Sequence, residues 1–205
     1  MKRIFYIIGK SSTGKDTILS ALLQDPALQL TEIVQYTTRP IRDGEEEGRE
    51  YHFITMEESL RLRDAGKIVE ERVYETVHGP WKYMFVDDGQ IEKAEGDLAA
   101  VGTVESYCRV RDYFGKDRVL PIYIYVETGE RLQRALNRER THENPKYAEM
   151  CRRFLADEQD FSDEKLREAG LLDDKGRLLN GFENISLPET IREVKEFVAG
   201  SRKTV

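Results

Sequence analysis

The residues with the clearest chemical potential form a glycine-rich turn near the start of the chain. The run Gly9-Lys10-Ser11-Ser12-Thr13-Gly14-Lys15-Asp16-Thr17 follows the apolar segment 4–8 and precedes the helix-forming segment 18–23. Backbone N–H groups of such a turn converge with the N-terminus of the next helix, where they stabilise phosphate groups. Gly9 and Gly14 let the backbone approach a phosphate closely, and Lys15 adds a mobile positive charge. The pattern predicts a P-loop for a nucleoside triphosphate, with an ordinary glycine loop before a helix as the alternative.

One position departs from the usual P-loop pattern GxxxxGK[ST]. Asp16 stands where a Mg²⁺-binding hydroxyl is expected, and Thr17 follows it. Magnesium prefers oxygen ligands, which both side chains offer. Asp16 and Thr17 are therefore the candidate metal residues, and which of them contacts Mg²⁺ stays open.

Two groups of arginines supply further chemistry. Arg39 and Arg42 flank a proline in a predicted loop, and a planar guanidinium suits the paired oxygens of a phosphate. Arg134 and Arg138 lie four residues apart on one face of a predicted helix. Because phosphoryl transfer depends on cations around the moving group and on exclusion of water, these arginines predict a kinase with a lid.

Length, charge and cysteine content narrow the class of protein. A chain of 205 residues supports one core with small insertions. A net charge of -7 argues against a broad basic surface for nucleic acid or an anionic membrane. No apolar run approaches the roughly 20 residues of a membrane span, and a strand follows Met1-Lys2-Arg3 directly, unlike a signal peptide. We expect a cytoplasmic protein with a small-molecule partner and reduced, packed Cys108 and Cys151; the oligomeric state stays open.

The predicted elements alternate between strand and helix, which favours an α/β fold with a parallel sheet. Expected strands cover 4–8, 30–36, 50–54, 68–74, 81–86, 98–102 and 119–126, with a turn at 78–80. Residues 181–185 are expected to form a short strand or a loop. One helix is expected to begin after Gly14 and another at the capping box that starts with Thr55. Further helices are expected over 89–95, 104–114, 128–140, 147–169 and 188–198. We predict a single P-loop domain of three layers, whose parallel sheet is flanked by helices. Its core comprises 1–34, 87–127 and 170–205, with a small, mostly β insertion at 35–86 and a helical lid with its following helix at 128–169.

The order of these parts resembles the guanylate kinase family. The most specific piece is Thr37-Thr38-Arg39-Pro40-Ile41-Arg42, followed at the family's distance by Glu50-Tyr51-His52-Phe53, because P-loops are widespread and that loop is not. The resemblance covers nearly the whole chain. It implies ATP- and Mg²⁺-dependent phosphoryl transfer to a nucleoside monophosphate, with GMP as the first choice of acceptor.

The resemblance also implies roles for individual residues. Arg134, Arg138 and Arg153 would close over the transferring phosphate beside Lys15; Arg152 or Arg140 can replace one of them, since the lid is a few residues longer than usual. The acceptor phosphate would be held by Arg39, Arg42, Tyr51 and Tyr83, guanine by Glu70, and adenine would lie near Asn184. The ATP set is Gly9, Ser11, Ser12, Thr13, Gly14, Lys15, Asp16, Thr17 and Asn184. For each side chain a structural role is the alternative: solvated arginines, hairpin-packing tyrosines, an exposed strand glutamate and a turn asparagine.

Several departures from the family pattern affect the acceptor base. Gln35 or Tyr36 stands at the family's serine, and Thr103 replaces part of an Asp-x-Asp pair. Met84-Phe85 follows Tyr83 where the family has Gly and a hydroxyl residue. Removing hydrogen-bond partners of a base relaxes or redirects its selection. Two alternatives therefore remain: a kinase of another small phosphorylated acceptor, and a protein-binding module with weak or lost catalysis.

Overall fold

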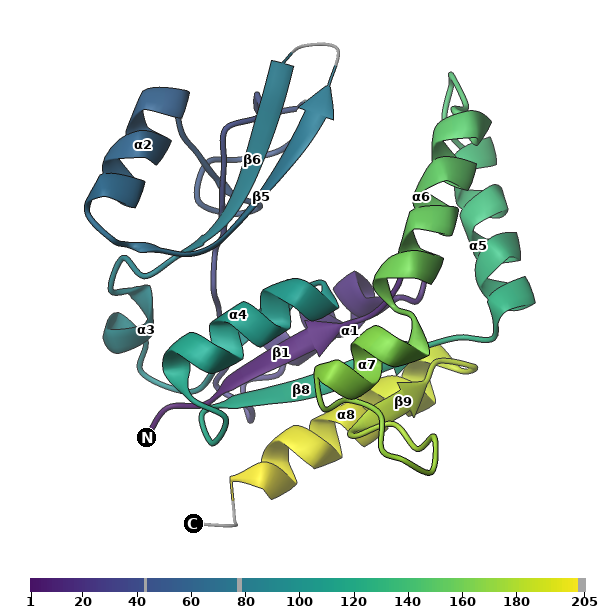
Figure 1. The fold of residues 1–205 in the computed structure, drawn as a ribbon. Helices are drawn as coiled ribbons and strands as arrows, with labels where there is room; N and C mark the ends of the chain where they lie inside the picture. Colours follow the sequence, from purple (N-terminus) through teal and green to yellow (C-terminus); the bar gives the residue numbers. More distant parts are fainter. Residues whose placement is uncertain (43, 77–78, 203–205) are drawn as a thin grey trace.

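The computed structural model describes residues 1–42, 44–76 and 79–202 (Figure 1). Its main sheet has five parallel strands in the order β2-β7-β1-β8-β9. These strands are β2 (Thr31–Glu32), β7 (Leu98–Gly102), β1 (Ile4–Ile8), β8 (Val119–Tyr125) and β9 (Gly181–Glu183). In register, Ile4 lies opposite Leu98 on one side and Val119 on the other. The predicted parallel α/β sheet is confirmed.

Alternation along β1 explains why helices cover both faces of this sheet. Ile4, Tyr6 and Ile8 pack into a core cluster that includes residues of α4 (Val104–Phe114) and α7 (Asp163–Glu168). Phe5 and Ile7 pack on the opposite side, with residues of α1 (Lys15–Leu23) and α8 (Leu187–Ser201). All five β1 residues are fully buried, as their unbroken apolar sequence predicts. The buried strand β1 thereby fixes the position at which the glycine-rich turn begins.

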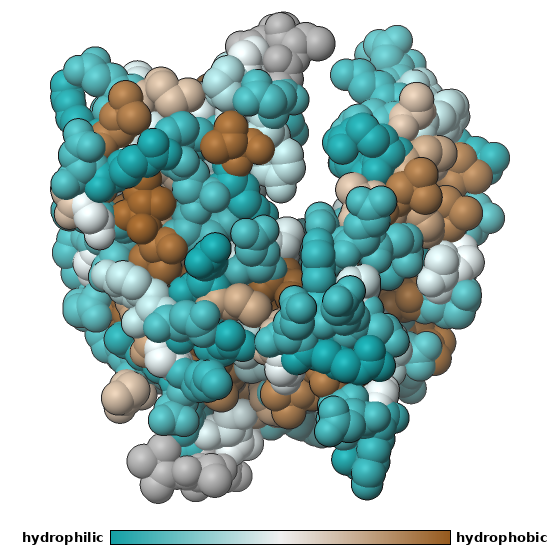
Figure 2. Space-filling view, in the orientation of Figure 1, coloured by the Kyte–Doolittle hydropathy of each residue, from teal (hydrophilic) through white to brown (hydrophobic). Residues whose placement is uncertain are grey.

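Two projecting parts rise from this core (Figure 1). One contains the four-stranded sheet β4-β3-β6-β5. Its strands are β4 (His52–Phe53), β3 (Tyr36–Thr37), β6 (Gly79–Val86) and β5 (Ile68–Thr76), accompanied by α2 (Met56–Asp64) and followed by α3 (Gln90–Lys93). The other part is made by α5 (Thr128–Arg140) and α6 (Tyr147–Asp160). Figure 2 shows the surface hollowed between the two parts, and most of the surface in this view is hydrophilic.

Two predicted elements are wrong, and side chains distant in sequence explain both. The strand expected over 30–36 splits into β2 and β3, which belong to different sheets. Between them the side-chain amide of Gln90 forms two hydrogen bonds with the backbone of Val34: its Oε1 accepts from the Val34 N–H at 2.9 Å, and its Nε2 donates to the Val34 carbonyl at 3.2 Å. Because these backbone groups are used by Gln90, the chain leaves the first sheet at Val34. The helix expected over 147–169 is interrupted after Asp160. There Phe161 turns into the core beside Tyr123, with ring centroids 6.1 Å apart, and a new helix follows.

Smaller differences concern the ends of elements and the cysteines. The strand expected over 50–54 is limited to His52–Phe53. The expected turn at 78–80 includes His78, which lies outside the described residues, and β6 begins at Gly79. Cys108 is half-buried and free as predicted, whereas Cys151 is free but exposed, because α6 buries its neighbour Met150 instead. No helix in the described ranges combines the length and apolarity needed to cross a membrane.

Candidate active site

The glycine-rich turn adopts the backbone geometry that a phosphate cradle requires. Gly14 is the N-cap of α1 with φ +88°, and Ser12 also has positive φ, at 67°. A Cβ on Gly14 would lie 2.5 Å from Asn184 Nδ2, and one on Gly9 would lie 2.5 Å from the Ile124 carbonyl oxygen. Both positions therefore need glycine for space, and Gly14 also needs it for conformation. Buried Thr13 stabilises the turn by donating from Oγ1 to the Lys10 carbonyl at 2.8 Å.

Two buried oxygens beside this turn fit a nucleotide. Within the described residues, Ser12 Oγ and Asn184 Oδ1 have no hydrogen-bond partner. The Asn184 amide nitrogen donates to the Thr13 carbonyl at 2.8 Å, which fixes the side chain behind the P-loop. An unsatisfied buried polar atom is costly, so a ligand donor at either oxygen would be favourable. The assignment of Asn184 to the adenine remains a prediction.

The candidate metal residues lie at the exposed start of α1. Lys15 Nζ is 3.2 Å from Asp16 Oδ2, and the Asp16 side chain is 78% exposed. Thr17 is exposed as well. A carboxylate and a hydroxyl next to the phosphate cradle fit Mg²⁺, which takes one or two protein oxygens in addition to substrate phosphates. Among the described residues, no group of three potential ligands forms a metal site by itself.

A buried arginine joins the predicted lid, α5 and α6, to the glycine-rich turn. Arg131 of α5 is 1% exposed and lies over the Phe154 ring of α6, with its guanidinium carbon 3.7 Å from the centroid. It donates to the Ser11 carbonyl and to Asp157 Oδ2, both at 3.3 Å, and it also pairs with Glu158. Asp157 Oδ2 in turn accepts from the Ser11 N–H at 2.8 Å. This cluster anchors α5 and α6 on the phosphate-binding turn.

Of this cluster only Ser11 is among the predicted site residues; Arg131, Asp157 and Glu158 are not. Lys10 contributes to it through an ion pair with Glu158 at 2.8 Å. Arg131, Arg134 and Arg138 follow one another at the spacing of one helix face. This spacing is the sequence signal that could have added Arg131 to the predicted site. The sequence separation between Ser11 and the two acids of α6 left no local signal for their contact.

The three predicted lid arginines have different surroundings. Arg134 pairs with Glu130 at 2.8 Å and donates to the Asn184 carbonyl at 2.9 Å. Arg138 and Arg153 line one small recess with Ser11 and Ser12 of the P-loop, and the recess also contains Arg131, Ala135, Met150 and Phe154. The structure thus brings these two arginines to the phosphate cradle, where their catalytic roles remain predictions.

Neither substitute arginine lines that recess. Arg140 is exposed, and Arg152 pairs with Glu149 at 2.7 Å. Glu149 is the main cause of the raised Arg152 pKa, and Tyr74 of β5 adds to it.

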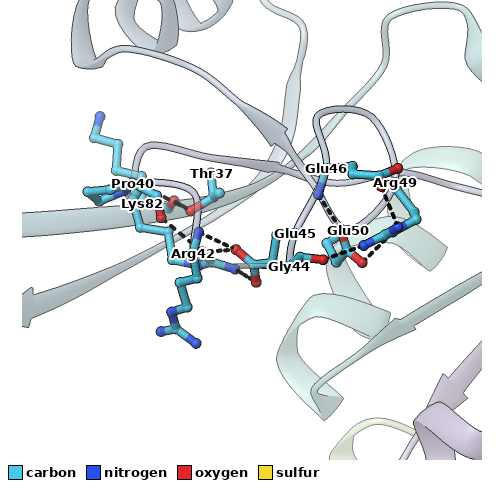
Figure 3. Close-up of polar contacts among 10 residues, drawn as sticks. Thr37, Pro40, Arg42, Gly44, Glu45, Glu46, Arg49, Glu50 and Lys82 are labelled. Atoms are coloured by element: carbon cyan, nitrogen blue, oxygen red, sulfur yellow. Dashed lines mark hydrogen bonds and ion pairs between the residues drawn. The ribbon is translucent and has the colours of Figure 1, made fainter.

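The predicted acceptor-phosphate side has a preformed cationic fork. Arg39, only 4% exposed, binds Glu45 through two hydrogen bonds of 2.6 Å, and its guanidinium lies 5.2 Å from the Tyr51 ring centroid. These hydrogen bonds, helped by the backbone N–H of Arg42 at 2.9 Å, lower the pKa of the Glu45 carboxyl to about 2. Figure 3 shows Glu45 within this loop beside the separate Arg49–Glu50 pair. A carboxylate here occupies the geometry that a phosphate can take.

Aromatic side chains border this fork. Tyr51 and Tyr83 make an edge-to-face contact with centroids 5.6 Å apart, and Tyr83 makes another with Tyr74 at 5.5 Å. Burial is the main cause of the raised Tyr51 pKa, Tyr83 adds to it, and the negative charge of Asp16 contributes. Arg42 is exposed, and the phosphate-binding roles of all four residues remain predictions.

The predicted guanine residue is part of a buried network. Glu70 Oε2 accepts from Ser106 Oγ at 3.1 Å, Ser106 Oγ lies 2.6 Å from the Tyr6 hydroxyl, and Glu70 Oε1 is 2.7 Å from Arg72 Nε. Burial raises the pKa of Glu70, although Arg72 and Ser106 favour its charged form. The Glu70 side chain is only 3% exposed. Among the described residues, Glu70 Oε2 therefore has a hydrogen-bond donor, whereas Oε1 has only the ion pair with Arg72 and no hydrogen-bond partner.

The remaining base-side candidates hold structural contacts. Thr103 caps α4 by accepting from the Ser106 N–H at 3.3 Å. Gln35 donates to the Val101 carbonyl at 2.6 Å, near Thr103. Tyr36 points elsewhere, donating to Asp88 at 2.7 Å, and burial followed by this hydrogen bond raises its pKa. Of the two candidates for the family's serine position, Gln35 is the one beside the end of β7.

These features define the class of protein. A parallel sheet with a glycine-rich turn between β1 and α1, a small β insertion and a projecting pair of helices give this chain the fold of a P-loop α/β protein. The "Guanylate kinase" family model matches residues 1–81. The guanylate kinase of Porphyromonas gingivalis is 33% identical over 144 residues, which cover 69% of this chain and 74% of that protein. The chain belongs to the guanylate kinase family.

Two further comparisons concern coverage and fold. The guanylate kinase of Cupriavidus metallidurans is 43% identical over 77 residues, which are 37% of this chain, and the chain spans 33% of that relative's length. The crystal structure of guanylate kinase from Anaplasma phagocytophilum has a TM-score of 0.61 at 19% identity and covers 97% of this chain and 85% of that one. The shared fold thus extends beyond the segment of strongest sequence similarity.

Proposed function

We propose that this protein transfers the γ-phosphoryl group of ATP to GMP, giving ADP and GDP. The observation that carries the proposal is the Arg39 fork, which binds the Glu45 carboxylate through two hydrogen bonds of 2.6 Å beside Tyr51. An anion-binding fork across from a triphosphate cradle is the arrangement that phosphoryl transfer between two nucleotides needs. Family membership supports GMP as the acceptor.

The chain's own residues would act mainly by positioning and by charge. The P-loop N–H groups and Lys15 would hold the outer phosphates of ATP, while Arg39 and Arg42 would replace their contacts with Glu45 by the acceptor phosphate. Arg138 and Arg153 would face the transferring group, and the lid would exclude water. Asp16 and Thr17 would hold Mg²⁺, which supplies charge neutralisation on the phosphates when bound. This scheme retains the division into a core, an acceptor insertion at 35–86 and a lid at 128–169.

A second candidate function keeps the reaction and changes the acceptor. It is favoured by the Glu70 carboxylate, whose oxygens face Ser106 and Arg72 instead of an open cleft. In that case another small phosphorylated metabolite would occupy the Arg39 fork.

The test is a coupled ADP-release assay with ATP, Mg²⁺ and separate acceptors: GMP, AMP, CMP, UMP and a set of sugar phosphates. We expect the highest kcat/KM with GMP. A folded protein that turns over a sugar phosphate but no nucleotide would establish the second candidate. No turnover with any acceptor would refute both candidate reactions and favour a protein-binding role. The Lys15→Ala variant provides the background rate of ADP release.

A further inference from the structure

The last turn of α6, where this helix meets the core, is unusually acidic (Figure 1). Asp157, Glu158 and Asp160 lie there, although the carbonyl end of a helix carries a partial negative charge that disfavours acidic side chains. Cations of other elements compensate two of the acids. Glu158 pairs with Lys10 at 2.8 Å, and Asp160 is 3.1 Å from Lys165 of α7. Asp157 is compensated differently, because its carboxylate contacts the backbone of the glycine-rich turn.

The predicted lid holds both backbone groups of Ser11. Asp157 Oδ2 accepts from the Ser11 N–H at 2.8 Å, and Arg131 donates to the Ser11 carbonyl at 3.3 Å. The same Asp157 oxygen accepts from Arg131 at 3.3 Å, so that the three residues form a closed ring of contacts. The side chain of Arg131 is 1% exposed and that of Asp157 is 17% exposed. The ring is therefore largely shielded from solvent, where hydrogen bonds to charged groups are strong.

The contact with Asp157 fixes the peptide plane between Lys10 and Ser11. In a trans peptide the C=O and N–H groups point in opposite directions. The Ser11 N–H points at Asp157, so the Lys10 carbonyl points to the other side of the plane. There it accepts from Thr13 Oγ1 at 2.8 Å. Both edges of this plane are thus held, one by the lid and one by the turn itself.

The contact with Arg131 fixes the next peptide plane, between Ser11 and Ser12. Its carbonyl points at Arg131, so the Ser12 N–H points away from that side chain. Ser12 has φ 67°, a conformation that a non-glycine residue keeps only where its surroundings impose it. The first N–H groups of α1, which begins at Lys15, have no partners within the helix. The contacts on Ser11 therefore set the direction of the chain that leads into these free N–H groups.

We infer that Asp157 is a positioning residue of the ATP site: by accepting from the Ser11 N–H, together with Arg131, it holds the glycine-rich turn in the conformation that receives the phosphates. The inference rests on the proposed function and adds a residue of the lid to its ATP site. Asp157 acts through the backbone and touches no reacting atom. Its acceptor oxygen is the feature that matters, because a negative charge near the phosphates by itself opposes ATP binding.

Two substitutions separate the hydrogen bond from the charge. Asp157→Asn keeps an oxygen that can accept from the Ser11 N–H and from Arg131. Glu158 still pairs with Arg131 in this variant. Asp157→Ala removes the acceptor oxygen altogether. Asp160→Ala, which removes an exposed acid from the same turn of α6, is the matched control.

Calorimetry measures equilibrium binding of ATP with Mg²⁺ and, separately, of GMP to each folded variant. We expect Asp157→Ala to bind ATP about 10- to 100-fold more weakly than the wild type, the range of one hydrogen bond to a charged group. Asp157→Asn and Asp160→Ala should stay within about threefold of the wild type. GMP affinity should be unchanged in all three, because the predicted acceptor site lies in the insertion at 35–86. In steady-state assays the same split should appear as a raised KM for ATP with an unchanged KM for GMP.

A measurement on the ligand-free wild type tests the inference without any substitution. The Ser11 amide, followed by NMR in ¹⁵N-labelled protein, should exchange with solvent at least about 100-fold more slowly than an unprotected amide. Rapid exchange of this amide would overturn the inference, even where Asp157→Ala fails to fold.

The outcomes separate the inference from the proposed function. Wild-type or tighter ATP binding by folded Asp157→Ala, with GMP turnover, would refute the inference and leave the reaction intact. An equal loss of ATP and GMP binding would show a structural role only and would overturn it. Equal weakening of ATP binding by Asp157→Ala and Asp157→Asn would overturn it as well, because the charge would then be the feature that matters. ATP binding that depends on the Asp157 oxygen in a protein that does not phosphorylate GMP would support the inference and refute the proposed reaction. A wild type that binds neither nucleotide would overturn both.

Discussion

Replacing Arg131 by Met tests whether the lid is anchored on the P-loop through a buried charge. The substitution keeps an unbranched side chain over the Phe154 ring but removes the hydrogen bonds to the Ser11 carbonyl and Asp157 and the contact with Glu158. Asp157 and Glu158 would then lack their main cation.

The structure sets the size of the expected effect. Removing one partner of a fully buried ion pair costs about 3–5 kcal/mol. Here the acids are partly open to solvent, with side chains 17% and 38% exposed, and Lys10 still pairs with Glu158. We therefore expect about 3 kcal/mol, near the lower limit. For a chain of this length that corresponds to a fall in Tm of about 6–12 °C.

Thermal unfolding followed by circular dichroism measures this effect, with urea unfolding as a second estimate. Arg140→Met is the matched control, because Arg140 lies on the same helix and is exposed; its free energy of unfolding should change by less than about 0.5 kcal/mol. Neutralising the acids as well, with Asp157→Asn and Glu158→Gln, should recover more than half of the loss. Equal Tm values for Arg131→Met and Arg140→Met would refute the anchoring role.

Three further predictions address the two phosphate sites. Lys15→Ala should lower kcat by about 10²- to 10³-fold in a steady-state assay, because it removes charge stabilisation from the transition state, and a kcat within a factor of three of wild type would exclude that role. Glu45 should make stability depend on acidic pH: its pKa is about 2 in the folded protein, below its ordinary 4.5, because Arg39 hydrogen-bonds its charged form. The stabilisation is complete above pH 4.5 and lost as pH falls toward 2, so Glu45→Gln should flatten the Tm profile between these values, and a parallel profile would contradict the pairing. Gly14→Ala should destabilise the protein by about 1–3 kcal/mol in urea unfolding, since φ is +88° and the new Cβ meets the Asn184 amide; an unchanged midpoint would show that the turn relaxes freely.

Local chemistry explains which elements could be predicted from the sequence. The unbroken apolar run of β1 and the helix signals around α2 depend on neighbouring residues only, and both elements begin where expected. Thr55 and Glu58 form the predicted capping box, with the Glu58 N–H donating to Thr55 Oγ1 at 3.1 Å and the Glu58 carboxylate accepting from the Thr55 N–H at 2.7 Å. The P-loop is equally local, since its glycines and lysine are contiguous.

The failures share a long-range cause. Gln90 redirects the chain at Val34 from 56 residues away, and Phe161 leaves its helix because the core beside β8 accepts its ring. Arg131 could be placed on the right helix face, but its acidic partners on α6 depend on the angle between two helices.

The central claim is phosphoryl transfer from ATP to GMP, and ³¹P NMR of the wild-type protein with equimolar ATP, GMP and Mg²⁺ tests it most directly. We expect the ATP β-phosphorus signal to fall while the β-phosphorus signals of ADP and GDP rise in equal amounts, with no growth of inorganic phosphate. The Lys15→Ala protein, folded by circular dichroism, should leave the spectrum nearly unchanged over the same period. An ADP signal that rises together with inorganic phosphate and without GDP would contradict the claim.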